Sequence, residues 1–368
     1  MSVFLRGIGV CLLTAWSLAA QAQILIGQTT GVTGQIAPTV KETNVGAMLY
    51  INAVNAQGGI RGEKIDIITL DDKFDPQLTL ANATTLITQR QVIALFMTRG
   101  TPHTEGIIPL LDQYGVPLIG PSTGSLVFHS PVKRHVFNVR ATYRREAEKA
   151  ISHLASIGTT RIAVIHVDDT FGLDGLAGAQ VGFEAAKLKP VLIDKFDRNK
   201  PDFSAIVQKL LSSEAQSVMI IGSGTAVTTG IRAVKAAGVR AQFVTLSNNA
   251  SEGFIKQLGA DAHGVIVTQV LPRTFAYPFV KEASEMAKAR QISEVSPAML
   301  EGFATAKVLV EALRRTTGKP TRASLQAALE RMQKYDLGGL EVSFSPTDHT
   351  GLDFADLSII GSNGKFLR

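Results

Sequence analysis

The sequence has very little cysteine and tryptophan. Cys11 and Trp16 are the only residues of their kinds in 368 positions, and both lie in the first apolar segment. The rest of the chain therefore has no thiol and can form no disulfide. It also lacks a G-x-x-x-x-G-K-[ST] phosphate loop, and no His, Cys and Asp residues have the spacing of metal ligands. We therefore expect neither a metal nor a cofactor.

Long hydrophobic runs are also missing, except near the start. The apolar run from Ile8 to Ala20 is too short to cross a bilayer comfortably. It follows Arg6 and ends in Ala20-Gln21-Ala22, and this small-x-small pattern is typical of a secretory signal peptide that is cut after Ala22. We therefore expect an exported protein that begins near Gln23.

The basic excess is modest and spread along the chain. There are 37 Lys and Arg residues against 31 Asp and Glu, a formal net charge of +6. No stripe of basic residues with interleaved aromatics occurs, which is the pattern that nucleic-acid binding would require. The charge therefore predicts a solvated surface and no nucleic-acid partner.

Short apolar runs alternate with helical periodicities twice along the chain. This order predicts parallel sheets covered by helices. A chain of this length also exceeds what one hydrophobic core supports. We therefore predict an α/β fold with two doubly wound lobes, onto one of which the helical segment 277–332 packs. The expected strands are 24–30, 64–72, 92–98 and 116–122 in one half and 161–169, 190–197, 217–223, 242–248 and 264–270 in the other.

Small hydroxyl, glycine and amide residues follow many of these strands. In open parallel sheets, ligands bind beyond the carboxyl ends of the strands. A helix N-terminus at that edge can hold a carboxylate through free N–H groups and a partial positive charge. Each residue alone is also explained as a helix cap, but their occurrence at successive strands favours a site for a small anionic or zwitterionic ligand. The segments are 29–30, 98–101, 122–125, 168–172, 223–225 and 247–249.

The segment GPSTGSL, residues 120–126, contains the pattern G-x-S-x-G. In many hydrolases this pattern is a strand-to-helix elbow that exposes a nucleophilic serine. Ser122 would then need a histidine that a carboxylate orients, and nothing in the sequence distinguishes one of the seven histidines for that role. Pro121 and the lack of a clear helix after Gly124 also disfavour the elbow, so we interpret the segment as a loop that binds without catalysing.

The segment NVGAMLYINAVNAQGGIRGEKIDIITLDDKFDPQ, residues 44–77, resembles a known family. It is similar to the type I periplasmic solute-binding proteins of the branched-chain amino acid (Leu/Ile/Val) ABC transporter class. In that family a helix ends in N-x-x-G-G-I-x-G, a strand follows, and D-D-x-x-D-P starts the next helix. The matching residues here are 55–62, 64–70 and 71–76, and the similarity extends over the whole chain after the signal peptide.

The resemblance implies two Rossmann-like lobes that are joined by three crossovers and close over a ligand. It further implies a small amino acid or carboxylate as ligand, an inner-membrane ABC permease as partner, a monomer, a periplasmic location and no enzyme activity. The lobes would comprise residues 23–141 with 270–337, and 142–269 with 338–368, and the crossovers would lie near Arg140, near Gln269 and at 338–345. The implied ligand contacts are Thr98, Thr101, Ser122, Thr123, Ser125, Phe171, Gly224, Thr225, Ser247, Asn248 and Asn249.

One position departs from the family pattern. Amino-acid binders of the family carry an acidic side chain where this sequence has Ser247, Asn248 and Asn249. A buried ammonium group without a charged partner is costly. Either Asp168, Asp169 or Glu252 supplies the charge, or the ligand is an aromatic or aliphatic carboxylate without an ammonium group. Arg99 either pairs with such a carboxylate or extends into solvent. A sensory module with the same fold is a further alternative.

Overall fold

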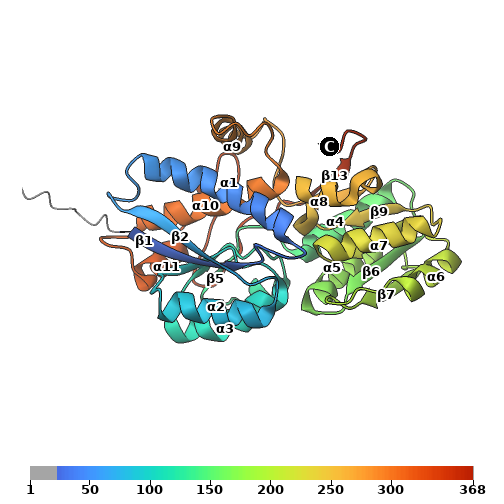
Figure 1. Cartoon of the computed structure of the whole chain (residues 1–368), viewed down its shortest axis with the longest axis horizontal. Coiled ribbons are helices and arrows are strands. Elements are labelled where there is room, and N and C mark those ends of the chain that lie inside the picture. The colour runs from blue at the N-terminus through green and yellow to red at the C-terminus, as the bar shows by residue number, and fades with distance from the viewer. Residues whose placement is uncertain (1–22, 368) are drawn as a thin grey trace, which may run out of the picture.

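The computed structural model describes residues 23–367, so the predicted signal peptide and its cleavage site at Ala22 lie outside the described residues. Two lobes lie side by side, each built on its own sheet (Figure 1). Parallel strands alternate with helices in both lobes, which confirms the predicted α/β class.

The first lobe contains a five-stranded sheet in the order β2-β1-β3-β4-β5. All of its strand pairs are parallel. The inner strands β3 and β4 are fully buried because helices cover both faces of the sheet, whereas the edge strand β2 is partly exposed. The bounds are β1 Gln23–Thr30, β2 Lys64–Asp71, β3 Ala94–Phe96, β4 Leu118–Ile119 and β5 Val136–Phe137.

Helices from both ends of the sequence build the first lobe. The core on one side of the sheet includes side chains of α1 (Ala37–Ala56), α9 (Pro278–Lys288), α10 (Pro297–Arg315) and α11 (Arg322–Glu330). A second core contains side chains of α2 (Pro76–Thr88) and α3 (Thr101–Tyr114). Helices α1 and α10 approach very closely, since a Cβ atom at Gly46 would lie only 1.9 Å from the carbonyl oxygen of Met299. The helices α9, α10 and α11 therefore belong to the first lobe.

The second lobe contains a seven-stranded sheet in the order β14-β13-β10-β9-β8-β6-β7. Its two C-terminal strands are antiparallel additions to a parallel sheet. The strands are β6 Ile162–Val167, β7 Leu192–Phe196, β8 Ser217–Ile221, β9 Gln242–Thr245, β10 Ile266–Gln269, β13 Asp356–Ile360 and β14 Phe366–Leu367. Its helices are α4 Tyr143–Ser156, α5 Thr170–Ala186, α6 Ser204–Ser213, α7 Gly224–Ala236 and α8 Glu252–Leu258.

The chain passes between the lobes three times. The first passage lies between β5 and α4, and the second between β10 and α9. The third passage lies farther along the chain than the predicted position at 338–345. A small hairpin of β11 (Tyr335–Asp336) and β12 (Glu341–Val342) precedes it, and Val342, Phe344 and Leu352 pack into the first-lobe core. These apolar contacts place residues 338–352 with the first lobe, so the passage lies between Leu352 and β13 rather than at 338–345.

The two lobes contact each other in this structure. Thr39 in α1 and Ser251, which precedes α8, share a hydrogen bond of 2.8 Å between their hydroxyl oxygens. The carboxylate of Glu42 accepts hydrogen bonds from the backbone N–H groups of Glu252 (3.0 Å) and Gly253 (2.7 Å). These bonds tie the start of α1 to the start of α8, so the two lobes are in direct contact at this place.

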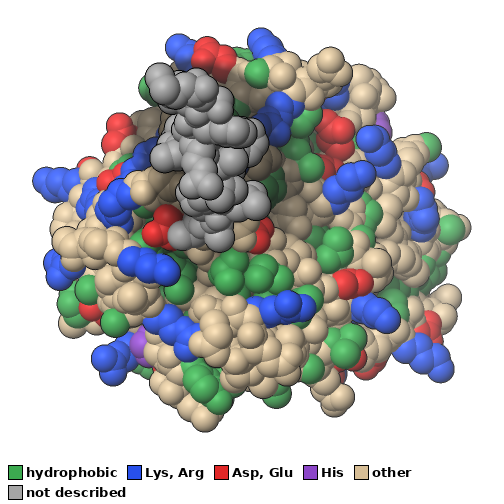
Figure 2. Space-filling model, turned by 60° about the vertical axis from the view of Figure 1, so that its left-hand side comes forward, with side chains coloured by type: hydrophobic (Ala, Val, Ile, Leu, Met, Phe, Trp, Pro, Cys, Tyr) green, Lys and Arg blue, Asp and Glu red, His purple; other side chains and the backbone are tan. Residues whose placement is uncertain are grey.

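The charged side chains are dispersed on the surface. Figure 2 shows Lys and Arg side chains spread over one face of the molecule, with Asp and Glu between them. Within residues 23–367, no helix has the length and apolar character needed to cross a membrane.

Candidate functional site

Ser122 lies at the lobe interface, just beyond the end of β4. Its hydroxyl donates a hydrogen bond to Oε1 of Glu301 in α10 (2.8 Å) and accepts one from Nη1 of Arg99 (2.9 Å). Its backbone N–H donates to the carbonyl oxygen of Thr98 (2.9 Å). The segment after it leads into a short 3-10 helix, Leu126–Phe128, rather than the α-helix of a nucleophile elbow. Within residues 23–367, the Ser122 hydroxyl thus bonds to a carboxylate and a guanidinium and to no imidazole.

Arg99 spans the two lobes. It follows β3 in the first lobe, and its Nη2 donates to the backbone carbonyl oxygen of Asn248 in the second lobe (2.6 Å). The side chain is buried, with only 4% of the residue surface exposed. The alternative that Arg99 extends into solvent is therefore wrong, and its guanidinium lies where the two lobes meet.

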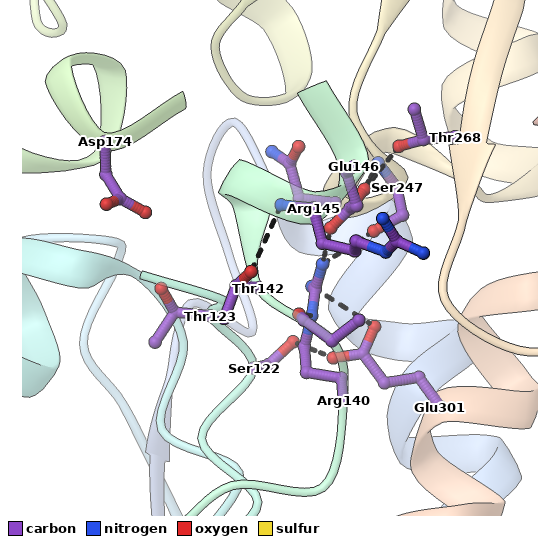
Figure 3. A network of polar contacts seen from close by, with 12 residues as sticks. Ser122, Thr123, Arg140, Thr142, Arg145, Glu146, Asp174, Ser247, Thr268 and Glu301 are labelled. Carbon is purple, nitrogen blue, oxygen red and sulfur yellow. Dashed lines mark hydrogen bonds and ion pairs between the residues drawn. The ribbon is translucent and has the colours of Figure 1, made fainter. Parts of the chain in front are cut away.

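A second arginine, Arg140, lies in the first passage between the lobes (Figure 3). Its guanidinium forms an ion pair with Glu146 in α4, and its Nη1 lies 3.8 Å from Oε2 of Glu301. It also donates to the hydroxyl of Ser247 (2.7 Å). Glu146 accepts further hydrogen bonds from the backbone N–H of Ser247 (2.9 Å) and from the hydroxyl of Thr268 in β10. Arg140 thus links carboxylates from both lobes.

The two arginines differ in their electrostatic surroundings. Burial opposes the charge of Arg140, but the carboxylates of Glu146 and Glu301 raise the pKa of its guanidinium above the usual value. Burial lowers the pKa of Arg99, and Glu301 offsets this only in part. The charge of Arg140 is therefore compensated by its neighbours, whereas that of Arg99 is compensated less.

The predicted hydroxyl residues of the first lobe come together. The hydroxyls of Thr101, at the start of α3, and Thr123 share a hydrogen bond of 2.8 Å, and both residues are buried. Thr98 is fully buried, and among the described residues its hydroxyl has no hydrogen-bond partner. Ser125 and Ser223 precede helices but make no side-chain capping bond. For these two residues the helix-cap alternative is therefore wrong.

The predicted amides of the second lobe bond within their own lobe. The Nδ2 group of Asn248 donates to the carbonyl oxygen of Gly222 (2.9 Å) and to the hydroxyl of Ser223 (3.0 Å). Asn249 accepts from the backbone N–H of Gly224 (2.9 Å) and donates to Gly222 (3.0 Å). These bonds hold the turn after β9 against the turn after β8. They leave the backbone carbonyl of Asn248 as the group that meets Arg99.

The remaining predicted contacts lie around this centre. Phe171, one of the predicted ligand contacts, is buried and packs on the ring of Tyr143 at a centroid distance of 4.6 Å. Thr225 is exposed, and its hydroxyl donates across the interface to the carbonyl oxygen of Gln35 (3.4 Å). Thr225 therefore lies at the solvent-exposed rim of the interface.

The acids proposed as partners of an ammonium group are engaged elsewhere. Asp169 caps α5 by accepting from the N–H groups of Phe171 and Gly172, as the cap alternative predicts, and it pairs with Arg198. Asp168 pairs with Lys195 at 2.8 Å, and its side chain is 46% exposed. Glu252 is 45% exposed and lies near Lys256. The structure thus disfavours all three as buried charge partners.

Sequence reasoning missed the acids that do lie at the interface. Glu146 and Glu301 belong to α4 and α10, and neither lies at the end of a strand. Asp174 in α5 accepts from the backbone N–H of Leu126 in the first lobe (3.1 Å). The available signal was the charged Glu301 within AMLEGFATAKVLV, a mostly apolar helical stretch that the structure buries completely. Within residues 23–367, no group of three or more His, Cys, Asp or Glu side chains could hold a metal ion.

Comparison with known proteins identifies the family. The family described as "Periplasmic binding protein" matches residues 23–355. An amino acid binding protein of Pseudomonas aeruginosa is 27% identical over 231 residues, and the match covers 62% of each chain, less than two thirds of that relative. The Leu/Ile/Val-binding protein of Escherichia coli K12 is 25% identical over 264 residues, which are 70% of this chain and 71% of that protein.

Solved structures agree with these sequence matches. The crystal structure of a possible leucine/isoleucine/valine-binding protein from Rhodopirellula baltica SH 1 superimposes with a TM-score of 0.87 at 25% sequence identity. The superposition covers 95% of this chain and 97% of the other, so both lobes and their relative arrangement are shared. The two lobes, the polar residues at their interface and the match over residues 23–355 together show that the chain belongs to the periplasmic binding protein family.

Proposed function

We propose that this protein is the substrate-binding component of an ABC importer, and that it encloses a small carboxylate-bearing solute between its lobes by hinge closure. The observation that carries the proposal is the path from Ser122 through Arg99 to Asn248, because it brings polar groups of both lobes to one point. A ligand that contacts these groups from both sides would favour closure. The mature chain would act in the periplasm as a monomer after removal of residues 1–22.

The predicted ligand contacts remain part of this proposal. The first lobe contributes hydroxyl groups and Arg99, while the second contributes backbone groups and the ring of Phe171. Branched-chain and related amino acids are one ligand class, because the Escherichia coli relative is named a Leu/Ile/Val-binding protein. Aromatic or aliphatic acids without an ammonium group are the other class, since Ser247, Asn248 and Asn249 carry no charge. A sensory module would share the fold but dock on a receptor instead of a permease.

Binding without catalysis is also part of the proposal. The Ser122 hydroxyl accepts a hydrogen bond from Arg99 and donates one to Glu301, so both its oxygen and its proton already have partners. We expect no turnover of a model ester such as p-nitrophenyl acetate by the wild-type protein. Turnover that disappears in the Ser122→Ala variant would show instead that Ser122 is a nucleophile.

A thermal-shift screen of residues 23–368 tests the binding proposal. The protein is first unfolded and refolded to remove carried-over solutes, and a dye reports unfolding because Trp16 lies outside this segment. The panel pairs leucine, valine and phenylalanine with their deaminated acids and includes benzoate. At a hundredfold excess over Kd, a ligand should add about 2.7 kcal/mol of stability. The absence of any shift across both classes would contradict the proposed function.

A further inference from the structure

Among the carboxylates at or beside the lobe interface, Glu146, Glu301 and Asp174 each face an arginine. Glu146 and Glu301 both face Arg140, from the second and the first lobe respectively. Asp174 pairs with Arg144 at 2.8 Å. Both oxygens of Glu146 are also occupied by hydrogen bonds. The carboxylate of Glu42 is instead bound by the backbone N–H groups of Glu252 and Gly253. These four acids therefore already have partners within the protein, and an ammonium group would have to compete for them.

Arg99 is the exception among the arginines at this place. Its two hydrogen bonds go to neutral acceptors, the hydroxyl of Ser122 and the backbone carbonyl of Asn248. Within the described part of the chain, no Asp or Glu oxygen forms an ion pair with Arg99. Its hydrogen-bonded link to Glu301 runs through Ser122, and the charge of Glu301 offsets the effect of burial only in part. A guanidinium has five N–H donors, so the two bonds leave three. Arg99 is therefore a buried arginine at the interface that can bind an anionic ligand.

We propose that Arg99 receives the carboxylate of the ligand, and that the ligand is a carboxylic acid without an ammonium group. The inference rests on the proposed function and narrows its substrate class. A guanidinium can bind a carboxylate through two parallel, charge-assisted hydrogen bonds, which are stronger than a bond to a neutral carbonyl. The ligand carboxylate then replaces the carbonyl of Asn248 as the partner of Arg99. A zwitterion would in addition have to bury an ammonium group beside carboxylates that already serve arginines.

The hydrogen bonds of the Ser122 hydroxyl support Arg99, rather than Ser122, as the residue that binds the ligand carboxylate. Its single proton is donated to Glu301, so Ser122 can give a hydrogen bond to a ligand carboxylate only by releasing Glu301. Its oxygen accepts from Arg99 and so orients the guanidinium. Ser122 is therefore a positioning residue for Arg99, and Arg99 is the residue that determines specificity.

Isothermal titration calorimetry tests the inference with ligand pairs that differ only in the ammonium group. The pairs are 4-methylpentanoate with leucine and 3-phenylpropanoate with phenylalanine, and benzoate is added as a single ligand. We expect the wild-type protein to prefer at least one acid over its amino acid by about 100-fold or more, because a buried unpaired charge is disfavoured. The Arg99→Gln variant should lose about 100-fold in affinity for that acid, and Arg99→Lys less.

Arg198→Gln is the matched control. Arg198 also reaches the other lobe, where its guanidinium carbon lies 5.0 Å from the ring centroid of Phe74, but it is paired with Asp169. Its variant should keep the preference for the acid. If Arg99→Gln fails to fold, the test uses the preference of the wild-type protein for the acid over the amino acid, together with the affinity of the Arg99→Lys variant for the acid.

The outcomes separate this inference from the proposed function. Leucine or phenylalanine binding as tightly as the deaminated acids would overturn the inference and leave the proposed function standing. Equal affinity of the acid for the wild-type protein and Arg99→Gln would also overturn it. If no compound of either class binds, the proposed function fails together with the inference.

Discussion

Arg140 and Glu146 form a buried ion pair where the chain first passes from one lobe to the other. The side chains are 3% and 0% exposed, and Glu301 of the first lobe adds a second carboxylate at 3.8 Å. Since Glu146 also accepts from Ser247 and Thr268, this pair is the centre of a polar network in the hinge. We expect it to set both the stability of the protein and the relative position of the lobes.

Replacing one partner of this pair should be costly. The Glu146→Gln variant leaves a buried guanidinium with one distant carboxylate, and removal of one member of a buried pair costs about 3–5 kcal/mol. Glu148→Gln is the control on the same helix. Glu148 forms an ion pair with Arg145 at 3.7 Å, but its side chain is 35% exposed, so the loss of this pair should cost less than about 1 kcal/mol. Urea unfolding measures both values. Equal costs for the two variants would show that the pair is not central.

Two buried histidines should make stability fall in mild acid. Burial lowers the pKa of His103 and of His129 to about 4, from an ordinary value of 6.5. Between pH 6.5 and 4 the unfolded chain then binds more protons than the folded one, so stability decreases as the pH falls. Each histidine contributes a loss of about 3 kcal/mol over this range.

His103 can be tested separately because its ring stacks on Phe74 at a centroid distance of 4.3 Å. The His103→Phe variant keeps an aromatic ring there and removes the titrating group. The free energy of unfolding, measured in urea from pH 7 to 4, should fall less steeply in the variant. Parallel curves for the variant and the wild-type protein would contradict the prediction.

Gly224 should be required for closure. Its φ is +50°, and a Cβ atom there would lie 2.2 Å from the carbonyl oxygen of Gln35 in the opposite lobe. The Gly224→Ala variant should therefore hold the lobes apart and weaken ligand binding about tenfold or more, because closure energy is lost. Gly238→Ala is the matched control, since its φ is +83° and no atom lies within 4 Å of the added Cβ.

The control variant separates backbone strain from the clash between lobes. Gly238→Ala should lose about 1 kcal/mol of stability from strain alone and bind ligand as the wild-type protein does. Titration calorimetry with the best ligand of the screen measures binding by both variants. Equal binding by Gly224→Ala and Gly238→Ala would show that the Gln35 contact does not limit closure.

Much of the fold could be predicted because short apolar runs alternate with helical periodicities along most of the chain. Nearly continuous apolar runs such as IAVIHV and SVMII become buried parallel strands, β6 and β8, in the structure. The last passage between the lobes was placed too early, since residues 338–352 show no periodicity that tells which core their apolar side chains join. Val342 and Leu352 pack into the first-lobe core through contacts that only the tertiary structure reveals.

The site could be predicted only where it follows the strands. Ser122 and Ser247 follow strand ends, where the rule for open sheets places ligand sites. Ser122 bonds to Arg99 and Glu301, and Ser247 bonds to Arg140, so both belong to the polar network between the lobes. Glu301 could not be placed in this way, since it comes from a helix 179 residues after Ser122 and joins it only when α10 packs onto the first lobe. The charges of the site therefore come mostly from residues that strand ends do not reveal.

Small-angle X-ray scattering tests the central claim of ligand capture between the lobes most directly. Refolded, ligand-free protein is measured alone and with a saturating concentration of whichever of 4-methylpentanoate, 3-phenylpropanoate or benzoate stabilises it most. The account predicts a smaller radius of gyration with the acid than without it, and a scattering curve that fits the arrangement of the lobes described here. An unchanged radius of gyration at saturation, with binding confirmed by calorimetry in the same sample, would contradict closure over the ligand.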